Sequence, residues 1–130
     1  MALKKRRKRS AVSITALKKL RFQAMLVKDG NRCLKCGATG GLAPSHIFPQ
    51  GRYRNMAWEL DNVKPLCNAC HMFWWHKHPT ESGEWFRQKF PERYARLLKM
   101  SQEYCPKPDL IKVKSDYEAI INHGLDLQSY

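Results

Sequence analysis

The sequence predicts an α+β fold in one domain, with two short strands, a pair of cysteine knuckles and flanking helices. A chain of 130 residues is large enough for one hydrophobic core and too small for two independent ones. Two Cys-x-x-Cys pairs, Cys33 with Cys36 and Cys67 with Cys70, enclose a segment with room for two strands and a loop. Apolar residues at helical spacing lie on both sides of that segment.

Residues 1–12 are predicted to form a disordered basic arm. Of the net charge of +13, most lies at the front, because residues 1–28 hold ten basic side chains and no acidic one. The arm carries a run of six cations without an apolar partner: Lys4, Lys5, Arg6, Arg7, Lys8 and Arg9. Phosphate groups of DNA are the expected partner, with an affinity that falls as salt rises. A solubilising tail or a nuclear-import signal is the alternative.

A helix is predicted over residues 13–28, with Ser13 as its N-cap and Gly30 at its end. One face is apolar, and the opposite face is expected to carry four cations: Lys18, Lys19, Arg21 and Lys28. Such a basic face suits DNA binding and an ordinary solvated surface equally well.

The segment between the cysteine pairs is predicted to form two strands joined by a loop. The first strand ends near His46, and the second spans residues 61–66 with a break at Pro65. Arg52 and Arg54 lie among aromatic residues in the loop, where they are expected to contact the DNA backbone.

A short helix is expected to begin near Asn68 and to carry His71. Three aromatic residues should pack this helix against the helical segment that begins at Pro79: Phe73, Trp74 and Trp75. That second helical segment presents Trp85 and Phe86 on one side.

The carboxyl-terminal part of the chain is predicted to be a linker followed by a short helix. Pro91 breaks the preceding helical segment, and two further prolines mark the linker. The last helix is expected over residues 115–123, ended by Gly124. The predicted organisation is therefore a main domain over residues 13–104 and a linker with a short helix over residues 105–130.

Paired cysteines at this double spacing predict a structural zinc site. Zinc prefers four tetrahedral ligands, and two knuckles supply four thiolates: Cys33, Cys36, Cys67 and Cys70. Four reduced cysteines or a redox pair are the alternatives, and the βαβ context of a thioredoxin-like redox pair is missing. Cys105 stands alone and is expected to be a packing residue.

No apolar segment approaches the roughly 20 residues that a membrane-spanning helix needs. No apolar region of a signal peptide follows the basic run either. The sequence therefore predicts a cytoplasmic protein without membrane attachment, in which cysteines serve as metal ligands or reduced thiols.

These elements together make the sequence resemble the HNH, or ββα-metal, nuclease family. The resemblance covers roughly residues 18–78 and is greatest to small HNH proteins of bacteriophages and prophages. It rests on four short motifs in order: Cys33-Leu34-Lys35-Cys36-Gly37, Ser45-His46-Ile47, Asp61-Asn62 and Leu66-Cys67-Asn68-Ala69-Cys70-His71.

The resemblance implies a metal-dependent endonuclease that hydrolyses DNA phosphodiester bonds. It implies that His46 is the general base that activates water, and that Asn62 holds the loop carrying His46. His71 would bind the catalytic divalent ion, Mg²⁺ or Mn²⁺, beside the structural Zn²⁺. His76 is a candidate second ligand, although five positions after His71 it reaches the same ion only where the helix ends or tightens.

Ser45 departs from the pattern of the family, in which many members carry an Asp or a His as a second metal ligand at this position. A serine hydroxyl is a poor ligand for Mg²⁺ or Mn²⁺, so His76, Asp61 or Glu59 would have to replace it, or water would. The alternative function is a zinc-stabilised DNA-binding or packaging accessory protein whose nuclease site is weakened or lost.

The resemblance also implies a setting and partners. The expected setting is the cytoplasm of a bacterial host, with the protein encoded by a phage or prophage. The oligomeric state stays open, and a monomer is favoured because a single active site would most simply nick DNA. A phage packaging or recombination protein is a candidate partner. Nicking and double-strand cleavage, and the DNA site or structure recognised, stay open.

Overall fold

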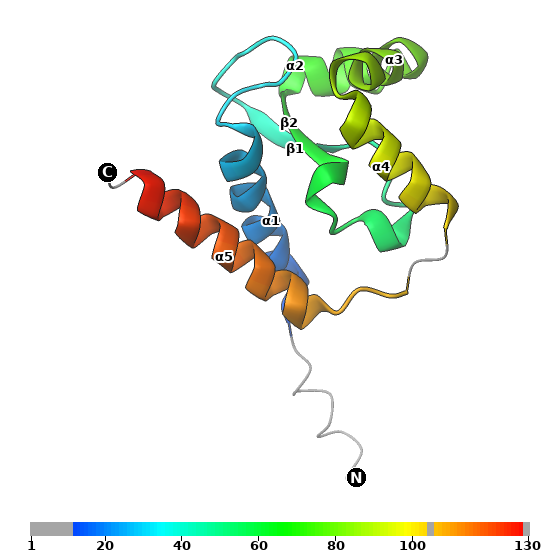
Figure 1. Ribbon diagram of the computed structural model, residues 1–130. Helices are drawn as coiled ribbons and strands as arrows, with labels where there is room; N and C mark the ends of the chain where they lie inside the picture. Colours follow the sequence, from blue (N-terminus) through cyan, green and yellow to red (C-terminus); the bar gives the residue numbers. More distant parts are fainter. Residues whose placement is uncertain (1–11, 104–105, 129–130) are drawn as a thin grey trace.

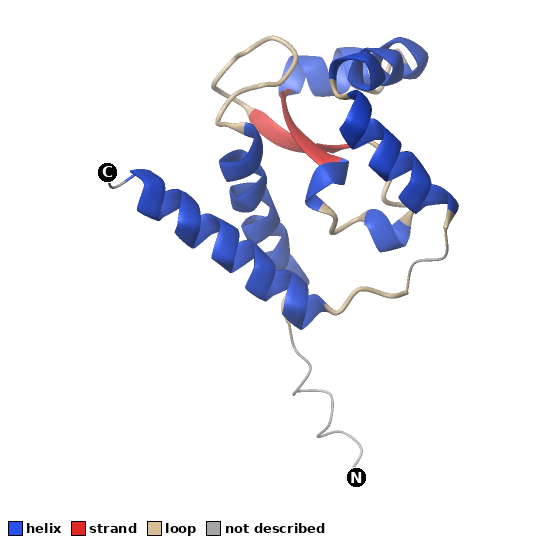
Figure 2. Cartoon of the chain, in the orientation of Figure 1, coloured by secondary structure: helices blue, strands red, loops and turns tan. Residues whose placement is uncertain are grey.

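The computed structural model describes residues 12–103 and 106–128. The chain folds into an α+β structure whose two strands lie between two groups of helices (Figure 1, Figure 2). Helices α1 and α5 lie together on one side of the sheet, and α3 and α4 lie on the other side. The elements are α1 (Ile14–Asp29), β1 (Leu42–His46), β2 (Val63–Cys67), α2 (Asn68–Cys70), a π-helical turn η4 (His71–Trp75), α3 (Pro79–Lys89), α4 (Pro91–Gln102) and α5 (Leu110–Gln128).

The first helix begins and ends at the predicted capping residues. The Ser13 hydroxyl accepts a hydrogen bond from the backbone N–H of Ala16 at 3.2 Å, which satisfies one of the unpaired donors of the first turn. Gly30 ends the helix with φ 95°, a left-handed conformation that favours glycine. The predicted basic face is wrong in one residue, because Arg21 is buried.

Strands β1 and β2 form an antiparallel pair in which Ser45 lies opposite Lys64 and His46 opposite Val63. The prediction of a break at Pro65 is wrong, since β2 runs through this residue to Cys67. Pro65 pairs with Pro44, and its carbonyl points away from β1 to accept the N–H of Leu34. The two prolines therefore occupy a pair without hydrogen bonds between the strands, where a missing N–H costs the ladder nothing.

Two 3-10 turns shape the segment between the strands: η2 (Arg54–Met56) and η3 (Leu60–Asn62). Arg93 on α4 ties this segment to its surroundings. Its guanidinium donates to the backbone carbonyls of Asp61 and Val63, at 2.8 Å each, and to the Asp29 carboxylate at 3.1 and 3.3 Å. The start of β2 is thus joined to α4 and to the end of α1.

Helices α3 and α4 each begin at a proline, as expected for a residue that lacks an N–H and suits the first turn. The predicted last helix is wrong in its bounds, because α5 begins at Leu110 and continues through Gly124 to Gln128. Gly124 does not end the helix. A methyl group on its Cα would lie 2.8 Å from Val27, so glycine is needed where α5 approaches α1.

The buried apolar side chains form two clusters. One lies around the sheet, α3 and α4, and consists of Cys33, Met56, Leu66, Cys67, Trp75, Phe86 and Leu97. The other joins α1 to α5 and consists of Leu17, Ala24 and Tyr117. Trp74 packs edge-on against Trp85, as predicted, with ring centroids 5.1 Å apart. Phe73 does not join the core, because its side chain is 66% exposed.

The basic arm at Lys4–Arg9 and the lone Cys105 lie outside the described residues. Within the described part of the chain, no helix is long and apolar enough to cross a membrane.

Candidate functional site

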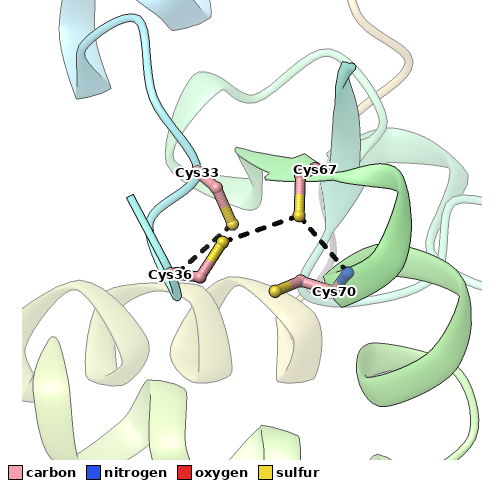
Figure 3. Close-up of side chains that lie close together, drawn as sticks. All are labelled: Cys33, Cys36, Cys67 and Cys70. Carbon is pink, nitrogen blue, oxygen red and sulfur yellow. Dashed lines mark hydrogen bonds between the residues drawn. The ribbon is translucent and has the colours of Figure 1, made fainter. Parts of the chain in front are cut away.

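The four paired cysteines meet in one cluster (Figure 3). Their sulfur atoms all lie within 4.8 Å of one another, and those of Cys36 and Cys67 are 3.7 Å apart. Ligand sulfurs about 2.3 Å from a tetrahedral zinc ion would be separated by roughly 3.8 Å. All four thiols are free of disulfide bonds. The cluster could therefore hold a zinc ion.

Both knuckles turn a backbone amide toward a sulfur. The N–H of Cys36 donates to Cys33 Sγ, and the N–H of Cys70 donates to Cys67 Sγ, at 3.5 Å each. Gly37, with φ 82°, closes the first knuckle. The first knuckle is joined to β2 by the hydrogen bond from Leu34 N–H to Pro65 O, which brings the two pairs together.

The two ends of the cluster differ in acidity. Burial acts to raise the pKa of Cys33, but backbone N–H donors, including that of Cys36, outweigh it and lower the pKa to about 6. Burial and thiol neighbours raise the pKa of Cys70. A thiolate therefore forms more readily at Cys33 than at Cys70, and a divalent cation would compensate the charge that accumulates when all four sulfurs ionise.

A second pair of candidate ligands lies on the turn that follows the cluster. The Nε2 atoms of His71 and His76 are 2.9 Å apart, although the residues are five positions apart in the chain. The cause is the π-helical turn: the N–H of His76 bonds to the carbonyl of His71, five residues back, at 3.2 Å. We expected His76 to reach His71 only if the helix ended or tightened, and instead the helix widens.

His46, at the end of β1, is half-buried with its ring oriented by a backbone carbonyl. Its Nε2 lies 3.2 Å from the carbonyl oxygen of Ala57. Since a carbonyl can only accept, Nε2 carries the proton in this contact and Nδ1 bears the lone pair of the neutral ring. Burial, with a further contribution from the charge of Arg21, lowers the pKa of His46 to about 4. The imidazole is therefore neutral at pH 7.

Arg21 binds the same carbonyl. Its Nη1 donates to Ala57 O at 2.8 Å, and its guanidinium carbon lies 4.8 Å from the centroid of the Trp58 ring. The Ala57 carbonyl thus accepts from both Arg21 and His46. This role could not be predicted from the sequence, because Arg21 occurs in a basic segment that is typical of a solvent-exposed surface.

Asn62 connects the two segments that position His46. Its side-chain oxygen accepts the N–H of Phe48 at 2.8 Å, and its amide donates to the carbonyls of Phe48 at 3.0 Å and Met56 at 3.2 Å. Phe48 lies two residues after His46, and Met56 lies directly before Ala57. Asn62 is fully buried, and its hydrogen bond to Met56 O is buried as well, so these contacts take the place of hydrogen bonds to water.

His46, His71 and His76 line one surface cavity of about 620 Å³. The π-helical turn, β1 and the loop after β1 form its walls, and Phe48 and Tyr94 add aromatic surface. The volume is in the range of small-molecule and substrate pockets. Three imidazoles from two distant parts of the sequence therefore face a common space.

Ser45 does not contribute to this cavity. Its side chain is buried and accepts a hydrogen bond from Lys64 Nζ at 3.3 Å. Side chains alternate between the faces of a strand, so Ser45 and His46 point in different directions. Lys64 is itself fully buried, with Nζ 3.1 Å from the centroid of the Trp75 ring. Burial lowers the pKa of Lys64 well below its ordinary value.

The two acids considered as replacement ligands lie elsewhere. Asp61 forms ion pairs with Arg96 at 3.1 Å and with Lys28 at 3.8 Å. Glu59 lies beside Tyr117 in a different surface hollow. In the described part of the chain, no third His, Cys, Asp or Glu donor lies close enough to His71 and His76 to form a three-ligand group.

The predicted DNA-contacting arginines are exposed in the loop between the strands. Arg52 lies with its guanidinium carbon 5.6 Å from the Tyr53 ring centroid, and Arg54 lines a second cavity.

Taken together, these features define an α+β protein with a four-cysteine cluster that could bind zinc. Comparison of the chain with protein-family models, with curated proteins and with solved structures finds no match.

Proposed function

We propose that the protein is a metal-dependent HNH endonuclease that hydrolyses phosphodiester bonds of DNA. One observation carries the proposal: His46, His71 and His76 converge on a single cavity, with the tautomer of His46 set by the Ala57 carbonyl. Hydrolysis of an anionic phosphodiester needs an activated water and a positive charge beside the leaving oxygen. His46 would activate the water, and His71 and His76 would bind the ion that supplies the positive charge.

His46 acts as the general base. Its Nδ1 lone pair faces an incoming water and takes one proton as the water oxygen attacks phosphorus. The low pKa keeps the imidazole neutral in the resting state, and an anionic phosphate in the cavity raises this pKa toward the value a base needs. Asn62 and Arg21 hold the ring of His46 in position, because their hydrogen bonds fix the two segments that surround it.

His71 and His76 would hold the catalytic ion. Two nitrogens bound about 2.1 Å from one ion at a right angle are roughly 3 Å apart, and the observed separation is 2.9 Å. When bound, a divalent ion supplies positive charge to the scissile phosphate and to the leaving 3′ oxygen. Two imidazoles favour a transition-metal ion over Mg²⁺, so Mn²⁺ suits this pair better than Mg²⁺.

The four-cysteine cluster would hold a structural zinc ion. The cluster closes all four positions with sulfur, which leaves no site for water or substrate. Its second knuckle runs directly into the turn that carries His71. Zinc at this point would fix the position from which the catalytic pair extends.

A second candidate function is a zinc-stabilised DNA-binding or packaging accessory protein with a weakened nuclease site. The contact between Ser45 and Lys64 favours it, because the hydroxyl is turned away from the cavity and none of the described residues that line the cavity is acidic. The ion would then have two protein ligands and would depend on water and phosphate for the rest.

Plasmid nicking separates the two candidates. The wild type, His46→Ala and the control His123→Ala, whose histidine is exposed on α5, are each tested with Mn²⁺ and Mg²⁺. We expect cleavage by the wild type and the control, and a loss of about 100-fold or more in His46→Ala. An absence of wild-type cleavage with any divalent ion would exclude the enzyme. Equal cleavage by His46→Ala would exclude His46 as the base.

A further inference from the structure

A second cavity lies next to the histidine cavity and shares a lining residue with it. Its volume is about 670 Å³, and Ala57, whose carbonyl binds His46, forms part of its wall. Gln50 lines both cavities. The two spaces are therefore direct neighbours, and the second is built from parts of the chain that are distant in sequence, since Ile14 and Leu110 also border it.

The chemical character of the second cavity is specific. Arg54 and Lys107 provide two cations, and none of the described residues that line the cavity is acidic. Gln50 contributes an amide, while Trp58 contributes an aromatic surface. The guanidinium of Arg21 lies against the Trp58 ring and fixes it in place.

These groups match the parts of a nucleotide. Arginine and lysine bind phosphate, amide side chains hydrogen-bond to base edges, and an indole ring provides a surface for base stacking. An anionic small molecule or an acidic peptide would use only the two cations. A nucleotide would also use the amide and the aromatic ring, so the combination favours a nucleotide. The volume is also in the range of a ligand pocket.

We infer that the second cavity binds one nucleotide of the DNA strand that is cut, close to the scissile phosphate. The inference rests on the proposed function for the position of the scissile phosphate in the histidine cavity. The bound nucleotide would press against the backbone that carries Ala57, so occupancy of this cavity would also fix the acceptor of His46.

The test measures the binding of full-length, zinc-loaded protein to a 20-base-pair duplex by fluorescence anisotropy without added Mg²⁺ or Mn²⁺. The pocket variant is Arg54→Ala with Lys107→Ala. The control, Lys89→Ala with Lys99→Ala, removes the same charge from exposed positions on α3 and α4. Each variant is also measured with duplexes that carry a single abasic site at successive positions.

We expect the pocket variant to bind about tenfold more weakly and the control to change by less than about threefold. An abasic site at one position should weaken the binding of the wild type about tenfold and leave the binding of the pocket variant unaffected. The reason is that removal of the base and substitution of the pocket abolish the same interaction. This coupling distinguishes binding in a specific pocket from a general loss of positive charge. Unchanged melting temperatures and zinc contents establish that the variants are folded.

Equal losses in the pocket variant and the control would overturn the inference, as would an abasic series without any coupled position. Coupling that appears with RNA of the same sequence and not with DNA would overturn the assignment to DNA. Coupling on DNA in a protein that cuts no substrate with any divalent ion would uphold the nucleotide site and exclude the proposed endonuclease.

Discussion

The Nε2 atoms of His71 and His76 lie 2.9 Å apart because a π-helical turn brings residues five positions apart onto one face. In an α-helix the same two side chains would be about 140° apart. Turns of this kind widen the helix at the expense of regular hydrogen bonding and often occur at functional sites. The turn follows the second cysteine knuckle directly, so Cys67 and Cys70 lie on the same short segment as His71 and His76.

The first prediction concerns this pair. His76→Ala should weaken the binding of Mn²⁺ by about tenfold or more, because one of two protein ligands is lost. The matched control is His78→Ala, which removes an exposed histidine from the same segment. Isothermal titration of Mn²⁺ into zinc-loaded protein measures both. Equal Mn²⁺ affinity in His76→Ala and the wild type would show that His76 is not a ligand.

The second prediction concerns Asn62. Asn62→Asp keeps the shape of the side chain but removes the two donors that bind Phe48 O and Met56 O, and places a carboxylate in a fully buried site. We expect a loss of about 3 kcal/mol in the free energy of unfolding, from unpaired carbonyls and a buried charge. Urea unfolding measures the loss. Asn122→Asp, at an exposed position on α5, is the control, and equal stabilities of the two variants would contradict the role of Asn62.

The third prediction is a pH dependence due to His46. Its pKa is about 4 in the folded protein and is ordinarily 6.5, so the unfolded chain takes up the proton first as the pH falls. The neutral ring therefore contributes fully to the stability of the folded protein above pH 6.5. This contribution is lost as the pH falls toward 4. The full loss corresponds to about 3 kcal/mol.

Comparison of the wild type with His46→Gln isolates this effect, because both proteins share the acid sensitivity of the cysteine cluster. Urea unfolding between pH 7 and pH 4.5 should show the wild type losing stability more steeply than the variant. Parallel curves would show that His46 titrates normally.

The fourth prediction concerns the cysteine cluster. The wild type should contain one zinc ion per chain, and Cys36→Ser should lower both the zinc content and the melting temperature, by about 10 °C or more. Cys105→Ser, which removes a cysteine outside the paired spacing, should leave the zinc content unchanged. Atomic emission and thermal unfolding measure the two effects. A zinc-free wild type with the same melting temperature as the chelator-treated protein would exclude a structural zinc.

The fifth prediction uses two helical glycines. A methyl group on Gly124 would lie 2.8 Å from Val27, whereas one on Gly83 would meet nothing within 4 Å. Gly83→Ala should stabilise the protein by about 0.5–1 kcal/mol through helix propensity. Gly124→Ala should destabilise it by about 1–2 kcal/mol, because the clash outweighs the gain in propensity. Equal stabilisation by both substitutions in thermal unfolding would show that α5 does not pack closely on α1.

Several features of the fold could be predicted because local interactions decide them. Ser13 and Gly30 bound the first helix through their own capping geometry, and Pro91 breaks the helical segment because it lacks an N–H. The cysteine spacing likewise determines both knuckles, since each is a turn of a few residues.

The candidate site could be predicted in part. His46 lies at the end of a strand, as predicted for the segment after the first cysteine knuckle, and the placement of Asn62 beside the His46 loop agrees with the hydrogen bonds observed. Arg54 and the cysteines are also where the sequence placed them. The site roles of these residues stay predictions until cleavage and metal binding are measured.

The helix caps and the cysteine knuckles can be predicted from the sequence, because neighbours along the chain supply the interactions that form them. Tertiary contacts account for the burial of Arg21 against Ala57, for the hydrogen bond from Lys64 to Ser45, and for the continuation of α5 through Gly124. These outcomes depend on contacts between residues 19 to 97 positions apart in the chain. Burial through such distant contacts overrides the local preferences of charged residues and turn residues. A short stretch of the sequence does not include both partners of these contacts.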